Sequence, residues 1–367
     1  MLRWLFALVV VAHALIHLLG FVKAFELASI EQLSRPIGKA AGTAWLLAAI
    51  VLSGVAVAYL VKAPWWWMLA LPAVLLSQGL IISVWHDAKV GTVANVIVLI
   101  GAAVAYGGWQ FQSQTRAEVR RLLSEQPPAP MSMVTETRLD TLPQPVQRWL
   151  RRSEVVGAAM VQRGYLEQRG RMRTSPEGGW LPFRAAQWFN LARPGFVWST
   201  RVRFAPGIHL LGRDHFLAER GHMKIALLGL LPVVDASGPK IDQGALLRFV
   251  AELMWFPSAV LRDYLQWQPI DRHSARVEVP LADGRVSGVF RFADNGDVVG
   301  FDAKRYFQRE AGATLEDWHI SVEPDGYERF AGVRVPARLA VTWKLAAGDY
   351  TWLNLELTHL ERDINRE

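Results

Sequence analysis

Residues 196–204 read Phe-Val-Trp-Ser-Thr-Arg-Val-Arg-Phe, an alternation of apolar and polar side chains. A period of two residues predicts a β-strand that buries one face and exposes the other. The buried face would carry Phe196, Trp198, Thr200, Val202 and Phe204, and the exposed face Ser199, Arg201 and Arg203. Such a strand is typical of an antiparallel sheet with a core on one side.

Similar runs occur at 165–174, 183–191, 209–217, 222–228, 275–281, 285–292, 298–307, 315–322, 337–345 and 350–360. About ten strands joined by short turns such as Asp283-Gly284 and Asn295-Gly296 predict a meandering antiparallel sheet, curled or nearly closed. A helix at about 242–255, ended by Pro257, interrupts the sheet, and a shorter helix at 143–152 precedes it. Residues 140–367 are therefore predicted to form an α+β soluble domain with a curved sheet and a covering helix.

The helix at 242–255 carries a charged pair beside an apolar stripe. The stripe consists of Leu246, Phe249, Val250, Leu253 and Phe256. Arg248 and Glu252 lie one turn apart on another face, where a surface pair would contribute only about 0.3–0.5 kcal/mol. If the helix lies across the mouth of the curled sheet, the pair faces a cavity and Glu252 becomes a ligand-facing or acid–base carboxylate. Glu252→Gln would cost less than about 1 kcal/mol in the first case and about 3–5 kcal/mol in the second. We expect the larger cost, because an exposed pair would gain little from its place among Phe249, Leu253 and Trp255.

The first 110 residues differ in composition from the rest of the chain. They hold six Lys or Arg and three Asp or Glu, out of 40 and 33 in the whole sequence. Four apolar runs, at 2–22, 40–61, 65–85 and 90–109, reach the length of about 20 residues that a helix needs to cross a bilayer. The first run lacks a cleavage pattern at 23–25. Residues 1–110 are therefore predicted to form a bundle of four uncleaved transmembrane helices.

Short links at 62–64 and 86–89 predict an up-down-up-down arrangement of these helices. A polar helix at 112–125 and the stretch Gln-Pro-Pro-Ala-Pro at 126–130 predict a helix and Pro-rich linker over residues 111–139. We expect a multi-pass protein of the bacterial cell (inner) membrane. Arg116, Arg120 and Arg121 favour the cytoplasmic side for the sheet domain and fit anionic headgroups.

Polar side chains in the predicted membrane helices are candidate functional residues, since an unpartnered polar group is costly there. His13 and His17 are spaced by one helical turn and project from one face. They would either hydrogen bond to Asn95, Gln78 or backbone within the bundle, or act as ligands of a haem or metal ion. The second alternative requires further ligands from other helices.

Several classes of function are excluded by what the sequence lacks. The chain has no cysteine, so it has no disulfide, thiolate metal site, iron–sulfur cluster or cysteine nucleophile. It has no Gly-rich phosphate loop, Gly-x-Ser-x-Gly elbow or His-Glu-x-x-His motif. Bases and acids are interspersed in the sheet domain, which argues against nucleic-acid binding. No catalytic residue is assigned, and no cofactor is expected outside the histidine alternative.

Five short motifs carry a resemblance to a known family. They are Leu142-Pro-Gln-Pro-Val-Gln-Arg-Trp-Leu150, Gln168-Arg-Gly-Arg-Met-Arg173, Pro194-Gly-Phe-Val-Trp198, Ala251-Glu-Leu-Met-Trp-Phe-Pro257 and Trp267-Gln-Pro-Ile-Asp271. Over residues of about 140–360 the chain resembles an uncharacterised bacterial membrane-protein family, a domain of unknown function. The resemblance implies no activity. In element order the sheet domain is also similar to the half-barrels of lipoprotein carriers, which work outside the cytoplasm.

The leading functional prediction is a non-catalytic one, in which the sheet domain holds an apolar or amphipathic ligand, a lipid, at the membrane surface. The predicted ligand-binding residues are Glu252, Arg248, Trp255, Trp198 and Trp188, with Phe183, Phe196 and Phe204 available to line the site. One alternative is a membrane redox protein that uses His13 and His17. Another is a scaffold that recruits a protein partner through an exposed sheet edge or the Trp-bearing surface.

Overall fold

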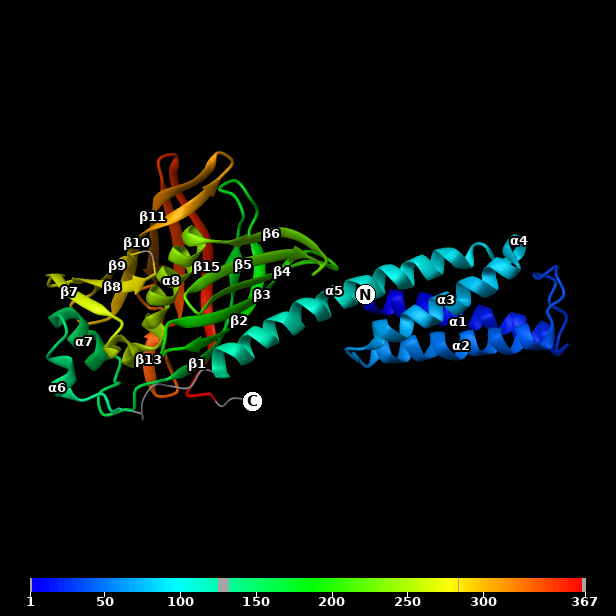
Figure 1. Ribbon diagram of the computed structural model, residues 1–367, viewed down its shortest axis with the longest axis horizontal. Helices are drawn as coiled ribbons and strands as arrows, with labels where there is room; N and C mark the ends of the chain where they lie inside the picture. The colour runs from blue at the N-terminus through cyan, green and yellow to red at the C-terminus, as the bar shows by residue number, and fades with distance from the viewer. Residues whose placement is uncertain (1, 125–131, 283, 365–367) are drawn as a thin grey trace. The chain divides into compact units, whose positions relative to one another are not determined.

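The computed structural model describes residues 2–124, 132–282 and 284–364 (Figure 1). The chain forms two compact units. One consists of residues 1–112 with 228–230, and the other of residues 113–227 with 231–367. The Pro-rich linker predicted at 126–130 lies outside the described residues.

The first unit is built from helices rich in apolar and small residues. They are α1 (Leu2–Ala24), α2 (Lys39–Leu60), α3 (Trp66–Ser83), the short α4 (Trp85–Ala88) and α5 (Gly91–Ser124). Of the described helices, α1, α2, α3 and α5 are long and apolar enough to cross a membrane, as the sequence predicted. Val10, Leu52, Trp66 and Val98 meet in the core of this unit.

Helix α5 continues well beyond its apolar run. The sequence analysis placed a separate polar helix after that run, but the two form one helix of 34 residues. The junction, Gln-Phe-Gln-Ser-Gln at 110–114, contains no Gly or Pro that would interrupt helical hydrogen bonding. The last turns of α5 belong to the second unit, where Leu122 packs with Val197 and Leu217.

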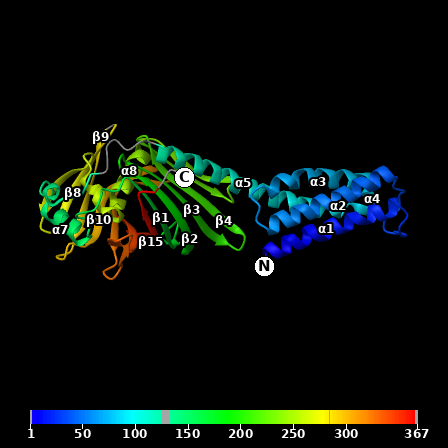
Figure 2. The ribbon, with the colours of Figure 1, turned by 90° about the horizontal axis from the view of Figure 1, so that it is seen from below.

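Thirteen strands of the described chain form one antiparallel sheet (Figures 1 and 2). They are β1 (Arg163–Met172), β2 (Leu181–Asn190), β3 (Gly195–Ala205), β4 (Ile208–Leu217), β5 (Arg220–Leu227), β6 (Leu231–Ser237), β7 (Gln266–Asp271), β8 (Ser274–Leu281), β9 (Gly284–Phe292), β10 (Val298–Arg309), β11 (Gly312–Val322), β14 (Arg338–Leu345) and β15 (Gly348–Arg362). Their order is β6-β5-β4-β3-β2-β1-β15-β14-β11-β10-β9-β8-β7. The first and last strands therefore pair in the middle of the sheet, and β6 and β7 are its edges.

Smaller elements flank the sheet. Helices α6 (Glu136–Leu139) and α7 (Gln144–Arg152) precede it, and β12 (Tyr327–Phe330) and β13 (Val333–Pro336) form a separate hairpin. Helix α8 (Pro239–Glu252), followed by the 3-10 turns η1 (Leu253–Trp255) and η2 (Pro257–Leu261), connects edge strand β6 to edge strand β7.

Helix α8 covers one face of the sheet, because the chain must pass from one edge to the other between β6 and β7 (Figure 1). It packs against β3, β4, β5, β6, β9 and β10. The core between helix and sheet contains Phe189, Phe249, Phe256, Phe290 and Phe301, each no more than 1% exposed. The predicted fold class, an apolar helical part followed by a large antiparallel sheet with a covering helix, is confirmed.

The sequence analysis missed four strands, β6, β7, β12 and β13. Strands β6 and β7 contain Pro232 and Pro269, and proline within a run argues against a central strand because it cannot donate a ladder hydrogen bond. Both strands lie at the edges of the sheet, where a missing donor is tolerated. Strands β12 and β13 have only four residues each, too few for an alternation to be recognised.

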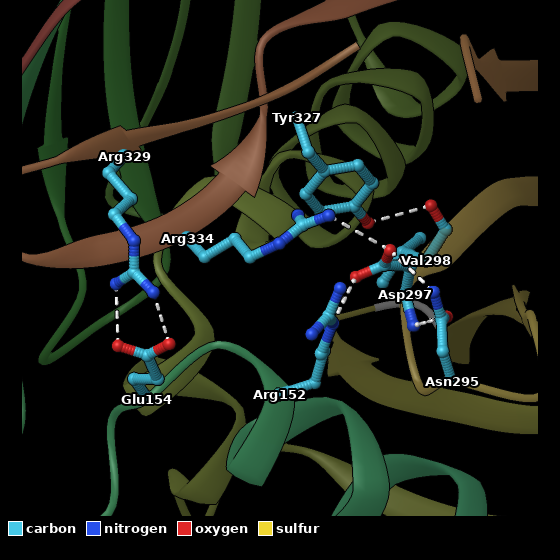
Figure 3. Close-up of polar contacts among 8 residues, drawn as sticks. All are labelled: Arg152, Glu154, Asn295, Asp297, Val298, Tyr327, Arg329 and Arg334. Atoms are coloured by element: carbon cyan, nitrogen blue, oxygen red, sulfur yellow. Dashed lines mark hydrogen bonds and ion pairs between the residues drawn. The ribbon is translucent and has the colours of Figure 1, made fainter. Parts of the chain in front are cut away.

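Asp297 forms ion pairs that connect three segments of the sheet unit (Figure 3). Its carboxylate, in the turn between β9 and β10, lies 3.2 Å from Arg152 of α7 and 3.1 Å from Arg334 of β13. Asn295 donates a further hydrogen bond to it at 3.0 Å. The Arg334 guanidinium also lies 4.2 Å from the centre of the Tyr327 ring.

Asp297→Asn is expected to lower the free energy of unfolding by about 1–3 kcal/mol, because two arginines lose the counter-charge that they share. Thermal unfolding of the detergent-purified protein, followed by tryptophan fluorescence, measures the change. The nearby pair of Glu154 and Arg329 is about half exposed on both sides, so Glu154→Gln is a control with a much smaller expected shift. Equal melting temperatures for the two variants would contradict the structural role of Asp297.

Candidate functional site

A cavity of about 180 Å³ lies between the sheet and α8. Most of its wall is aromatic or aliphatic. The strands contribute Phe183, Trp198, Val202, Met223, Ile225, Trp318, Ile320, Leu339, Val341 and Leu355, and the helical segment contributes Arg248, Ala251, Glu252, Met254 and Trp255. The site thus combines an apolar wall with a few charged groups, which is the usual composition of a ligand pocket.

The charged groups at the wall centre on Arg248. Its Nε lies 2.8 Å from Glu252 Oε1, and its Nη1 lies 2.8 Å from Asp214 Oδ2. Gln187 Nε2 donates to the other oxygen of Glu252 at 2.6 Å. The guanidinium stacks 4.7 Å from the centre of the Trp198 ring. The side chains of Arg248, Glu252 and Asp214 are only 15%, 8% and 10% exposed, so this is a largely desolvated cluster.

Burial has a clear electrostatic effect on this cluster. It raises the pKa of Glu252, and the positive charge of Arg248 opposes that rise. For Arg248, burial favours the neutral form, but Glu252 and Asp214 more than compensate and the pKa is raised. The guanidinium therefore remains charged and shares its charge between two carboxylates.

A second arginine, Arg305 of β10, also lines the cavity. Its guanidinium lies 5.1 Å from the centre of the Trp318 ring. Burial lowers the pKa of Arg305 to about 10. Across the cavity wall, Gln168 of β1 accepts a hydrogen bond from Trp198 Nε1 at 3.0 Å. The amide nitrogen of Gln168 is buried, and it has no partner within the described part of the chain.

The structure brings four of the five predicted ligand-binding residues to this cavity: Arg248, Glu252, Trp198 and Trp255. Trp188 lies elsewhere. The neighbouring odd-numbered residues of β2, Phe183 and Gln187, face α8, so the even-numbered Trp188 faces away from the cavity. It packs on the other side of the sheet, against the cluster of Leu122.

Two of the phenylalanines proposed for the lining also lie outside the cavity wall. Phe196 is completely buried in the core behind Arg248, whose guanidinium lies 5.1 Å from its ring. Phe204 is 61% exposed. The alternation of β3 was extrapolated to Phe204, but a bulge between Arg203 and Ala205 shifts the register there.

The sequence analysis missed four polar residues at the site: Asp214, Gln187, Arg305 and Gln168. Each lies on a strand far from α8 in the sequence, so its distance from Arg248 depends on strand order and register. The sequence contains one signal that could have identified these four residues. Each is a polar side chain at an inward position of an alternating strand, and such a residue needs a partner when it is buried.

The predicted intramembrane polar residues form a network in the helical unit. His13 Nε2 lies 3.1 Å from Ser77 Oγ and 3.0 Å from Asn95 Oδ1. Asn95 Nδ2 donates to Gln78 Oε1 at 3.0 Å, and His17 Nδ1 donates to the His13 carbonyl at 2.9 Å. In the part of the chain that the structure describes, no group of three or more His, Asp or Glu side chains is placed to hold a metal ion.

The comparisons with known proteins concern mainly the sheet unit. Residues 132–355 match the model of a family of unknown function, DUF6544. The chain belongs to the DUF6544 family. This agrees with the family resemblance in the sequence, and it adds no activity to the DUF6544 protein. The comparison with curated proteins gives no match.

Two solved structures are similar to the DUF6544 protein at low identity. One is an outer membrane lipoprotein-sorting protein domain from Vibrio parahaemolyticus, with 11% identity and a TM-score of 0.34 over 62% of this chain and 94% of that chain. The other is a DUF1329 family protein from Desulfovibrio piger, with 10% identity and a TM-score of 0.33 over 64% of this chain and 95% of that chain.

Proposed function

We propose that the sheet unit binds an apolar or amphipathic ligand, a lipid, in the cavity between the sheet and α8. The single observation that carries this proposal is the apolar cavity itself. Protein interiors are close-packed and contain few voids larger than a water molecule. An apolar cavity in an otherwise packed core lowers stability unless something fills it. An acyl chain would do so, with a gain of about 0.8 kcal/mol for each methylene that leaves water.

The helical unit supports a membrane setting for this function. We place α1, α2, α3 and α5 in the bacterial cell membrane, where the bilayer supplies lipid at high local concentration. A tethered binding domain needs only modest affinity for a ligand that is concentrated in this way. In this proposal membrane lipids are the partners of the protein.

Native mass spectrometry of the full-length protein in detergent tests the proposal. We expect a retained amphiphile on the parent protein and a several-fold lower occupancy on Ala251→Leu, since Ala251 lines the cavity and a larger side chain fills it. The matched control is Ala236→Leu on edge strand β6, away from the cavity wall. Equal occupancy in Ala251→Leu and the parent would contradict the proposed site.

A further inference from the structure

Arg305 is the charged group of the cavity that the DUF6544 fold leaves without a direct partner. Arg248 contacts two carboxylates at 2.8 Å. Arg305 makes no hydrogen bond or ion pair with any described residue, and its guanidinium lies 5.1 Å from the centre of the Trp318 ring. Asp214 and Glu252 attract it through space and Arg248 repels it, but it forms no ion pair with either carboxylate. The Arg305 guanidinium thus lines an apolar cavity, and its donors have no hydrogen-bond partner among the described residues.

The other unsatisfied groups at the cavity wall are also donors. The amide nitrogen of Gln168 and the indole nitrogens of Trp318 and Trp352 are buried without a hydrogen-bond partner within the described chain. Buried polar groups normally have partners, and a missing one indicates a water or ligand. Since all of these are N–H groups, the missing partner is an acceptor.

Helix α8 leaves space for the Arg305 side chain. A Cβ atom added at Gly244 would lie 2.8 Å from Arg305 Nε. Glycine in the interior of a helix is unfavourable by about 1 kcal/mol relative to alanine. At this position it allows the arginine to pass close to the helix backbone and reach the cavity.

We propose that the ligand is a single-chain amphiphile with a carboxylate head, which pairs with Arg305 while its chain occupies the apolar part of the cavity. This inference rests on the proposed lipid-binding function. The volume favours a single chain, because about 180 Å³ is less than the roughly 300–1,000 Å³ of common ligand pockets. The carboxylate head group is inferred from the guanidinium of Arg305, because the planar guanidinium can pair with a carboxylate through two parallel hydrogen bonds.

Photolabelling of the full-length protein in detergent tests the inference. The probes are analogues of lauric acid and dodecanol that carry the same diazirine in the chain, and labelled peptides are identified by mass spectrometry. Labelling of the cavity peptides is normalised to that of α1–α3, which reports how each probe partitions around the protein. We expect the acid to label the cavity about tenfold more than the alcohol, the factor for a charge-assisted hydrogen bond of about 1.5 kcal/mol.

Three variants distinguish the contribution of the carboxylate head group to binding from that of the apolar chain. Arg305→Met removes the charge at similar length, and it should abolish the preference for the acid while alcohol labelling stays unchanged. Gly244→Ala keeps the charge of Arg305 but displaces its side chain, and it should reduce the preference for the acid probe over the alcohol probe. Arg171→Met is the control, because Arg171 is an exposed residue of β1 outside the cavity wall.

The outcomes distinguish the two proposals. Equal labelling by acid and alcohol in the parent, or a preference that survives in Arg305→Met, overturns the carboxylate inference and leaves lipid binding intact. Absence of cavity labelling by both probes overturns the proposed function itself. Loss of the preference for the acid in Arg305→Met and a reduced preference in Gly244→Ala, with the preference of the parent retained in Arg171→Met, support the inference.

Discussion

Arg248→Met is expected to lower the free energy of unfolding of the sheet unit by about 3–5 kcal/mol. Methionine has a similar length and fills most of the same space, so the effect comes from the charge. Without Arg248, two largely buried carboxylates, Glu252 and Asp214, are left close together with no cation in contact. Chemical unfolding in detergent, followed by tryptophan fluorescence, measures the change.

Glu252→Gln should have a smaller effect, about 1–3 kcal/mol. The glutamine oxygen can still accept from Arg248 Nε, and Asp214 remains 2.8 Å from the same guanidinium. Burial also raises the pKa of Glu252, so part of the cost of its charge disappears with the substitution. The sequence alone predicted a larger cost for this variant, because it considered Arg248 and Glu252 as an isolated pair.

Arg169→Met provides the control for both variants. Arg169 pairs with Glu356 at 2.7 Å on the surface, where the arginine side chain is 62% exposed. Loss of that pair should change stability little, because exposed ion pairs contribute little. If Arg248→Met unfolds at the same denaturant concentration as Arg169→Met, the buried cluster has no structural importance.

A buried ion cluster is weak evidence for stability. Replacing a whole cluster of this kind by apolar residues is often neutral or stabilising. The triad of Arg248, Glu252 and Asp214 lies at the wall of an apolar cavity, which agrees with the proposed ligand-binding function. It gives a defined polar end to a site that is otherwise apolar.

The fold could be predicted from the sequence to the extent that it is encoded locally. The alternation at 196–204 and the turns such as Asn295-Gly296 identify central strands, because side-chain period and turn chemistry are local properties. The pairing of β1 with β15 joins residues almost 200 positions apart, and no local pattern specifies it. The edge strands β6 and β7 were not predicted, because each contains a proline. Proline argues against a central strand, but it is tolerated at the edge of a sheet.

The residues of the candidate site likewise fall into two groups, those that a local sequence pattern predicts and those that only the tertiary fold brings together. Arg248 and Glu252 could be paired from their spacing on one helix, which fixes their separation in space. Asp214 and Arg305 reach the same cavity from β4 and β10, on opposite sides of the sheet centre. Trp188 was placed on the wrong face because composition suggested an aromatic lining, whereas the register of β2 decides the direction of each side chain.

The pairing of β1 with β15 is the seam that joins the two halves of the sheet, and it contributes Gln168 and Leu355 to the cavity wall. Gly170 lies opposite Leu355 in this seam. A Cβ atom at Gly170 would lie 2.1 Å from the carbonyl oxygen of Asn354 and 2.9 Å from the Cα of Leu355. These are backbone atoms of the partner strand, so no side-chain rotation relieves the overlap.

Gly170→Ala is therefore expected to cost about 3 kcal/mol or more, at the upper end of the range for overpacked sites, because β1 and β15 must move apart. Widening of the seam should also displace Gln168 and reduce photolabelling of the cavity by the lauric acid probe. Gly179→Ala is the matched control, since a Cβ atom at Gly179 meets no atom within 4 Å. A Gly170→Ala protein with the melting temperature and cavity labelling of Gly179→Ala would show that this close approach of the two strands is not required.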